Sequence, residues 1–160
     1  MKNTILIGLL FIASLLPSTL KAQAKADKVL GYWLTLSEET GKPNSQVKIS
    51  KGTNGKYYGE IVWLQNPLET NGREKLDKHN PDDKLKSRKL IGLRILNDFT
   101  YDASEDEWSG GSIYNPTTGK TYNSYMKVDG NKLNLRGYIG KAWMGLGKTA
   151  VWTREASQRK

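Results

Sequence analysis

The stretch KTYNSYMKVDGNKLNLRGYIG, Lys120–Gly140, decides the fold class of this chain. Before Asp129-Gly130-Asn131, every second residue from Tyr122 to Val128 falls on one face of an extended chain. After that turn the same spacing places Leu133, Leu135, Gly137 and Ile139 together. A period of two is typical of a strand, and Asp-Gly tolerates the positive φ of a tight turn. The stretch therefore predicts an antiparallel hairpin, although the pattern does not decide which face points inward.

Further strands of the same kind are expected on both sides of this hairpin. Turn sequences such as Gly52-Thr53-Asn54-Gly55 and Asn115-Pro116-Thr117-Thr118-Gly119 separate them. The expected strands are Val29–Ser37, Gln46–Lys51, Lys56–Gln65, Leu90–Leu96, Glu107–Tyr114, Lys120–Asp129, Lys132–Gly140 and Lys148–Glu155. This spacing predicts an all-β fold, a small up-and-down antiparallel barrel of about eight strands. Such a barrel either fills its interior with side chains or holds one small ligand.

A long charged loop, Asn66–Lys89, is expected between the third and fourth strands. Connections of this length in a compact domain are typical of a lid, a binding loop or a short helix. Its candidate functional residues are Asp77, Asn80, Asp82 and Arg88. Their oxygens would suit a hard cation such as calcium, but the spacing is not that of an EF-hand. We therefore expect no metal site, and favour a turn followed by a short helix that Asp82 or Asp83 caps.

The N-terminal residues have the features of an export signal. Lys2 supplies a positive charge, Ile5–Leu16 is an almost unbroken apolar run, and Ala22-Gln23-Ala24 matches the pattern that signal peptidase reads. The run is shorter than the ~20 apolar residues that span a bilayer. We expect residues 1–24 to be a signal peptide that is removed, and residues 25–160 to form a single β-barrel domain of 160 − 24 = 136 residues. The alternative is a retained anchor helix.

Composition and charge narrow the expected location and partners. The chain has no cysteine, which excludes both disulfides and lipoprotein acylation. Loss of the two lysines in residues 1–24 lowers the formal charge from +9 to 9 − 2 = +7. The basic residues alternate with acidic ones, which favours a solvated surface, so nucleic acid is not an expected partner. We expect a periplasmic or secreted protein with no transmembrane segment after removal of the signal.

Several segments, taken in order, carry a resemblance to a known family. They are GYWLT at 31–35, YGEIVWL at 58–64, DKHNPD at 77–82, LKSRKLIGL at 85–93, IYNP at 113–116, GKTY at 119–122, LNLRGY at 133–138 and TAVWTR at 149–154. Together they resemble domain-of-unknown-function family 2147, small exported bacterial proteins. The resemblance implies a lipocalin-like (calycin-type) barrel whose structural signature is Gly31, Trp33 and a late Arg154 packed over that tryptophan. It implies no activity, because a shared fold does not fix function.

The sequence contains no clear motif for catalysis or for cofactor binding. His79 is the only histidine, so a catalytic triad or a two-histidine zinc site is not expected, and haem and other cofactors are not expected either. Gly145-Leu146-Gly147-Lys148-Thr149 lacks the upstream glycine of a phosphate-binding loop and leads into a strand. No catalytic residue is therefore assigned.

Aromatic and arginine side chains are the better candidates for binding. On different strands of a barrel they can fill the core or line a cavity. The expected ligand-facing residues are Trp63, Tyr114, Tyr122, Arg136 and Tyr138. A binder of a small amphipathic or anionic ligand, in the barrel or at its mouth beneath the 66–89 loop, is the first hypothesis. The alternatives are an envelope structural or interaction protein with a solid core, and an enzyme that uses Asp, Glu or Tyr.

Overall fold

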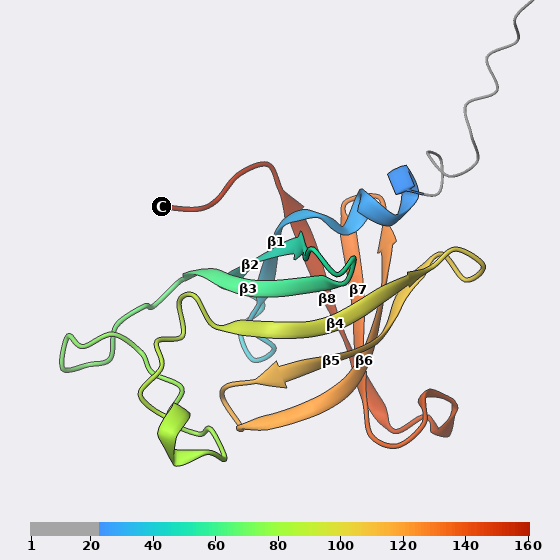
Figure 1. The fold of residues 1–160 in the computed structure, drawn as a ribbon. Coiled ribbons are helices and arrows are strands. Elements are labelled where there is room, and N and C mark those ends of the chain that lie inside the picture. Colours follow the sequence, from blue (N-terminus) through green and yellow to red (C-terminus); the bar gives the residue numbers. More distant parts are fainter. Residues whose placement is uncertain (1–22) are drawn as a thin grey trace, which may run out of the picture.

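The computed structural model describes residues 23–160, so the expected export signal lies almost wholly outside the described residues. Eight strands form one closed antiparallel barrel in which each strand pairs with the next and β8 pairs with β1 (Figure 1). They are β1 (Gly31–Leu36), β2 (Pro43–Lys51), β3 (Tyr57–Leu64), β4 (Arg94–Asp102), β5 (Glu107–Asn115), β6 (Lys120–Asp129), β7 (Lys132–Tyr138) and β8 (Gly147–Glu155). Three short 3-10 helices accompany them, η1 (Asp27–Val29), η2 (Asp83–Leu85) and η3 (Ala142–Met144). The expected all-β, up-and-down, eight-stranded barrel is confirmed.

The fourth strand differs from its expected position. The apolar run Leu90–Leu96 predicts a strand, whereas β4 begins at Arg94 and continues to Asp102. Asn97 and Asp98 are poor strand formers, and Asp98 has a φ of 62°, so local propensity hides the second half of the strand. Pairing with β5 overrides that propensity, because Thr100, Tyr101 and Asp102 all have partners there.

The alternating strand directions give the barrel two distinct ends. The hairpin turns β2–β3, β4–β5 and β6–β7 lie at one end with the N-terminal segment, which we call the closed end (Figure 1). The connections β1–β2, β3–β4, β5–β6 and β7–β8 lie at the other, which we call the loop end. At the closed end Ala26 and Val29 are buried, and their carbonyl oxygens accept hydrogen bonds from the indole N–H groups of Trp108 (3.1 Å) and Trp33 (2.8 Å). The segment before β1 therefore closes this end of the barrel.

Arg154 covers the same end from outside. Its guanidinium lies 4.1 Å from the centre of the Trp33 ring and donates to the carbonyl oxygens of Leu30 (2.9 Å) and Lys28. A Cβ on Gly31 would lie 3.3 Å from the Arg154 Nη1, and Gly31 has a φ of 116°, which disfavours any other residue. Stacking and hydrogen bonding together hold the Arg154 guanidinium over the face of the Trp33 ring, which would otherwise be in contact with water.

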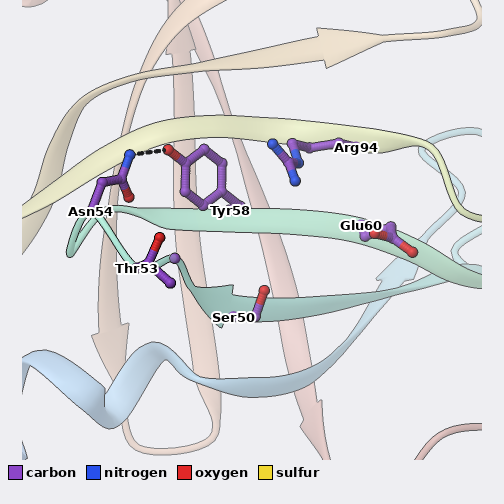
Figure 2. A pocket seen from close by; sticks show the side chains of 7 residues that line it. Ser50, Thr53, Asn54, Tyr58, Glu60 and Arg94 are labelled. Atoms are coloured by element: carbon purple, nitrogen blue, oxygen red, sulfur yellow. Dashed lines mark hydrogen bonds between the residues drawn. The ribbon is translucent and has the colours of Figure 1, made fainter.

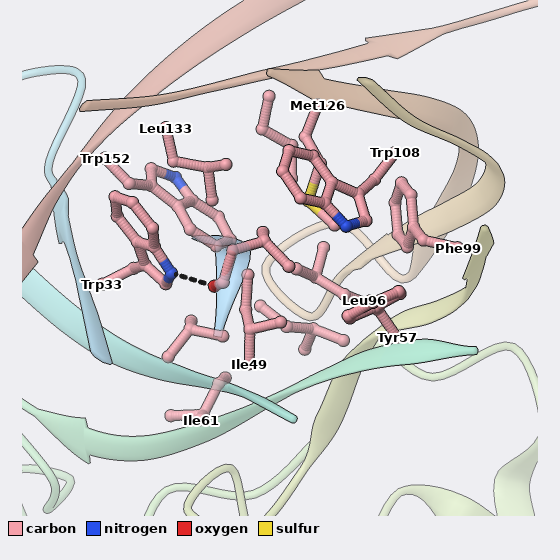
Figure 3. Packing of buried hydrophobic residues seen from close by; sticks show 14 of the residues in the cluster. Trp33, Ile49, Tyr57, Ile61, Leu96, Phe99, Trp108, Met126, Leu133 and Trp152 are labelled. Atoms are coloured by element: carbon pink, nitrogen blue, oxygen red, sulfur yellow. Dashed lines mark hydrogen bonds between the residues drawn. The ribbon is translucent and has the colours of Figure 1, made fainter. Parts of the chain in front are cut away.

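Large side chains fill the barrel interior (Figure 3). Trp33, Tyr57, Phe99 and Trp108 are almost completely buried, and Tyr57 meets Trp108 edge to face at 6.3 Å between ring centres. Glycine makes room for one of them, because a Cβ on Gly111 would lie 2.5 Å from the Phe99 ring. Burial of these side chains is the main favourable term in folding, about 1.5–3 kcal/mol for each large apolar one. Of the two expected forms of the barrel, the structure has the one filled with side chains.

Candidate functional site

The β3–β4 connection folds back over the outer face of the barrel. Two isolated antiparallel bridges, Leu68 with Glu74 and Leu76 with Lys89, give it an internal framework. Within it the side chain of Asp82 accepts a hydrogen bond from the backbone N–H of Lys84 at 3.0 Å and caps η2. The oxygen-rich part of the connection thus has its turn stabilised by its own side chains.

The buried carboxylate of Asp77 ties this connection to the barrel. It has no solvent exposure, and it accepts hydrogen bonds from the Tyr114 hydroxyl (2.5 Å), the Asn80 amide (2.8 Å) and the Arg88 guanidinium (2.9 Å). A buried charge is tolerated only when it is paired and hydrogen-bonded in this way. Burial and the bond to Asp77 raise the pKa of Tyr114 from 10.0 to about 12, so its hydroxyl stays protonated, and able to donate, further into the alkaline range.

A glycine in the β5–β6 turn allows the connection to lie flat against the barrel. A Cβ on Gly119 would lie 1.8 Å from the backbone oxygen of His79, and Gly119 also has a φ of 69°. Only glycine permits so close an approach of two backbones. Figure 1 shows the connection, in green, beside the turn between β5 and β6.

A groove of about 920 Å³ runs between the connection and the outer face of β3 to β6. Three basic side chains and two acidic ones line it, together with amide, hydroxyl and apolar groups. The lining residues are Glu60, Asn80, Pro81, Asp82, Leu85, Arg88, Lys89, Ile91, Gly92, Leu93, Arg94, Asn97, Tyr114 and Thr121. Ile91 is 45% exposed, which gives the groove an apolar wall open to solvent.

A second, smaller hollow of about 280 Å³ adjoins the groove and shares Glu60 and Arg94 with it (Figure 2). The Arg94 guanidinium lies over the Tyr58 ring at 4.6 Å, and the Tyr58 hydroxyl accepts from the Asn54 amide and donates to Asp98. Stacking fixes the planar guanidinium while leaving its donors available. Arg94 therefore stands between two hollows on the same outer surface.

The sequence-based site residues are distributed over several places. The structure brings Asp77, Asn80, Arg88 and Tyr114 together, and Asp82 lies beside them at the start of η2. Of the five residues expected to face a ligand, Tyr114 is the one that lines the groove.

The other four expected ligand-facing residues lie elsewhere. Trp63 lies under the C-terminal residues, with its N–H bonded to the Lys160 carbonyl and Arg159 at 4.9 Å from its ring. Arg136 alternates with the buried Leu133 and Leu135, and it bonds to Thr149 and to the Gly145 carbonyl. The ring of Tyr138 lies 6.2 Å from that of Tyr125, and Tyr122 packs beside the position of a Gly137 Cβ. These contacts are with neighbouring strands and with the C-terminal residues.

Residues 31–154 match the family described as uncharacterized proteins conserved in bacteria, DUF2147. The chain belongs to this family. The matched segment begins at Gly31 and ends at Arg154, the two residues that meet at the closed end. No curated protein matched the chain.

A solved structure places the DUF2147 barrel among lipocalin-like folds. It is a protein of Helicobacter pylori, HP1028, described as belonging to the lipocalin family. The two chains are 29% identical, with a TM-score of 0.66 over 81% of this chain and 84% of the other. The resemblance to the family and to a lipocalin-like barrel is thereby confirmed.

Among the groove residues of this DUF2147 protein that lie on strands, sequence reasoning missed four, namely Glu60, Arg94, Asn97 and Thr121. Glu60 and Arg94 are partners across β3 and β4. Their pairing depends on where β4 starts, and the apolar run at 90–96 obscured that position. The alternation in 58–64 places Glu60 opposite the apolar Ile61, and that is the one signal that could have placed Glu60 outside.

The described part of this DUF2147 protein holds neither a metal-binding cluster nor a membrane-spanning helix. Among residues 23–160, no three His, Cys, Asp or Glu side chains lie close enough to hold a metal ion. None of the helical segments in that part of the chain has the length and apolar character of a membrane-spanning helix.

Proposed function

We propose that this protein binds a small amphipathic anion in the groove beneath the β3–β4 connection. The observation that carries the proposal is the pairing of two arginines, Arg88 and Arg94, with the apolar wall formed by Leu85 and Ile91. Guanidinium groups match carboxylate and phosphate oxygens, and an apolar wall accommodates a chain or ring. The lipocalin-like fold supports small-ligand binding in general, while the chemistry of the ligand rests on the groove.

Both arginines retain free donors. Arg88 uses one Nη on Asp77, and its side chain is 42% exposed. Arg94 is exposed and is stacked on Tyr58. Lys89 is less available to bind an anion, because its ammonium group forms an ion pair with Glu74 at 2.7 Å. We infer that Arg94 is the principal anion contact, because Arg88 already neutralises a buried charge.

The ligand is expected on the outer surface of the barrel. The aromatic side chains that fill the interior leave the large hollow on the outside, where the connection provides its second wall. Of the two ligand positions in the first hypothesis from the sequence, we keep the one beneath the connection. We no longer propose a ligand inside the barrel.

Titration with decanoate tests the proposal. Chemical-shift changes of the backbone amides of Gly92, Asn97 and Thr121 would report binding, with decanol as the neutral probe and acetate as the chainless one. We expect decanoate to bind, both other probes to bind poorly, and Arg94→Gln to weaken decanoate binding by roughly tenfold or more.

Arg73→Gln is the matched control, because Arg73 is an exposed arginine of the same connection outside the groove lining. An equal loss of decanoate affinity in Arg94→Gln and Arg73→Gln would mean that only the net charge of the protein matters. If decanol bound as tightly as decanoate, the groove would not select an anion, and that part of the proposal would be wrong.

The filled interior favours one alternative, an interaction protein of the cell envelope with a solid core. This function would use the surface loops and require no small ligand. Crosslinking in intact cells should then trap one reproducible macromolecular partner. Decanoate titration without any groove shifts, together with such a partner, would favour this alternative over the first.

We propose further that residues 1–24 are a cleaved export signal and that the protein is periplasmic or secreted. Support comes from the start of the described residues, 23–160, where Ala26 is the first buried residue. Cleavage after Ala24 would leave intact the segment before β1 that closes the barrel. N-terminal sequencing of protein purified from its native cells should begin at Lys25, and a chain that retains Met1 would contradict the proposal.

A further inference from the structure

The β7–β8 connection exposes an unusual set of apolar side chains. Trp143 is 80% exposed, Ile139 64%, Leu146 59% and Met144 48%. In Figure 1 this connection, which contains η3, projects from the loop end of the barrel at the lower right. Scattered single apolar residues are normal on a protein surface, but here four lie within eight consecutive residues of one projecting connection, and we call them the apolar patch.

Hydrogen bonds hold this patch in a defined shape. Ile139 N–H donates to the Leu146 carbonyl at 3.0 Å, and Met144 N–H donates to the Lys141 carbonyl at 3.0 Å. The Arg136 guanidinium reaches from β7 to the Gly145 carbonyl at 3.1 Å. The apolar side chains are thus presented by a fixed loop, so little ordering entropy remains to be lost on binding.

The charged residues of the connection itself have one sign. Between Ile139 and Lys148 the chain carries Lys141 and Lys148 and no acidic residue. Both lysines are largely exposed, and Lys148 has an ion pair with Glu38 of the β1–β2 connection. A projecting apolar tip with a basic border is complementary to a surface that is apolar within and anionic at its boundary.

We infer that the β7–β8 connection docks the protein on the surface of an anionic lipid bilayer. Tryptophan favours the boundary between head groups and acyl chains, where Trp143 would lie, and Met144 and Leu146 would enter just below it. Lys141 would meet the anionic head groups, each such charge adding to the attraction. The groove opens on the outer face of β3 to β6, so lipid docking and ligand binding use different surfaces.

A second copy of the chain is a poorer occupant of this patch. A twofold contact would place the same residues of both copies together, including both copies of Lys141. The connection contains no acidic residue that could compensate these two charges. The shape is also that of a projection, whereas a small ligand needs a concave site.

Vesicle flotation tests the inference, using phosphatidylcholine vesicles with and without about 30% phosphatidylglycerol. We expect binding to the anionic vesicles that weakens with added salt, and much weaker binding to phosphatidylcholine alone. Trp143→Ser with Leu146→Ser should weaken binding roughly tenfold or more, and Lys141→Gln by a smaller factor.

Leu68→Ser is the control, because Leu68 is 49% exposed on the β3–β4 connection and lies outside the patch. Lipids brominated on the acyl chain should quench the fluorescence of the wild type and leave that of Trp143→Ser nearly unchanged. Circular dichroism verifies that each variant is folded.

Three results would overturn the inference. They are no flotation with anionic vesicles, flotation that survives the double substitution, and a concentration-dependent dimer, seen by sedimentation equilibrium, that the double substitution abolishes while vesicles remain unbound. Since decanoate binding is measured without vesicles, the groove proposal stands or falls separately.

Discussion

At the scale of single residues, Asp77 shows what sequence reasoning can and cannot reach. Its loop stands out by composition, and so do Asn80, Arg88 and Tyr114 individually. Their meeting depends on a connection that folds back by two isolated bridges onto a strand 37 positions further along the chain. No local spacing encodes such a contact, so the carboxylate could be named as a candidate but its partners could not.

Replacement of Asp77 by Asn should detach the β3–β4 connection. The change removes the charge that Arg88 neutralises and places an amide donor against the Tyr114 or Asn80 donors, at a cost of about 2–4 kcal/mol. Hydrogen exchange should show faster exchange across residues 66–92, with β1 and β2 unaffected. Asp83→Asn is the control, because the Asp83 side chain is 88% exposed and pairs with Lys86. Equal protection in both variants would show that Asp77 does not hold the connection.

At the scale of elements, clean alternation predicts the position of a strand well, whereas interrupted alternation does not. β6 has the expected bounds, and β8 differs by one residue. The strand expected at 90–96 is displaced from β4 because three apolar residues, Leu90, Ile91 and Leu93, precede β4, while Asn97 and Asp98 interrupt its middle. Pairing with a neighbouring strand is a tertiary effect, and propensity within a window does not report it.

The contact between the β3–β4 connection and the β5–β6 turn should fail when Gly119 becomes Ala. Its new Cβ would meet the His79 carbonyl, so the connection must lift away. Gly130→Ala is the matched control, because Gly130 also has a positive φ (54°) but nothing lies near its Cβ position. Both variants share a backbone cost of about 1–2 kcal/mol. Faster exchange in residues 66–92 of Gly119→Ala alone is the expected result, and similar exchange in the two variants would contradict it.

At the scale of the whole molecule, the barrel itself could be predicted but its filled interior could not. Turn spacing and alternation specify eight strands and closure. Which face points inward depends on side-chain volumes contributed by every strand at once, such as the contact of Phe99 with Gly111. Exclusion of a ligand from the interior is therefore a property of the assembled core.

Three tyrosine–aspartate pairs spread over the barrel predict a loss of stability in alkali. Burial, followed by the hydrogen bond to an aspartate, raises the pKa of Tyr57, Tyr101 and Tyr114 from 10.0 to about 12. The folded state therefore keeps these protons where the unfolded state loses them. Stability from this source is complete below pH 10 and falls as the pH rises toward about 12. Urea midpoints between neutral pH and pH 11 should fall, and less so in Tyr114→Phe, whereas a constant midpoint would contradict the argument.

Closure of the barrel between β1 and β8 has a consequence for the order of events in biosynthesis. The bond from Arg154 to the Leu30 carbonyl joins residues 124 positions apart. At about 5–20 residues per second, a ribosome needs roughly 6–25 s to pass from one to the other. Throughout that interval the first strand has an unpaired edge and Trp33 has no cover. The strand that contains Arg154 is thus the one whose synthesis ends this exposure to aggregation.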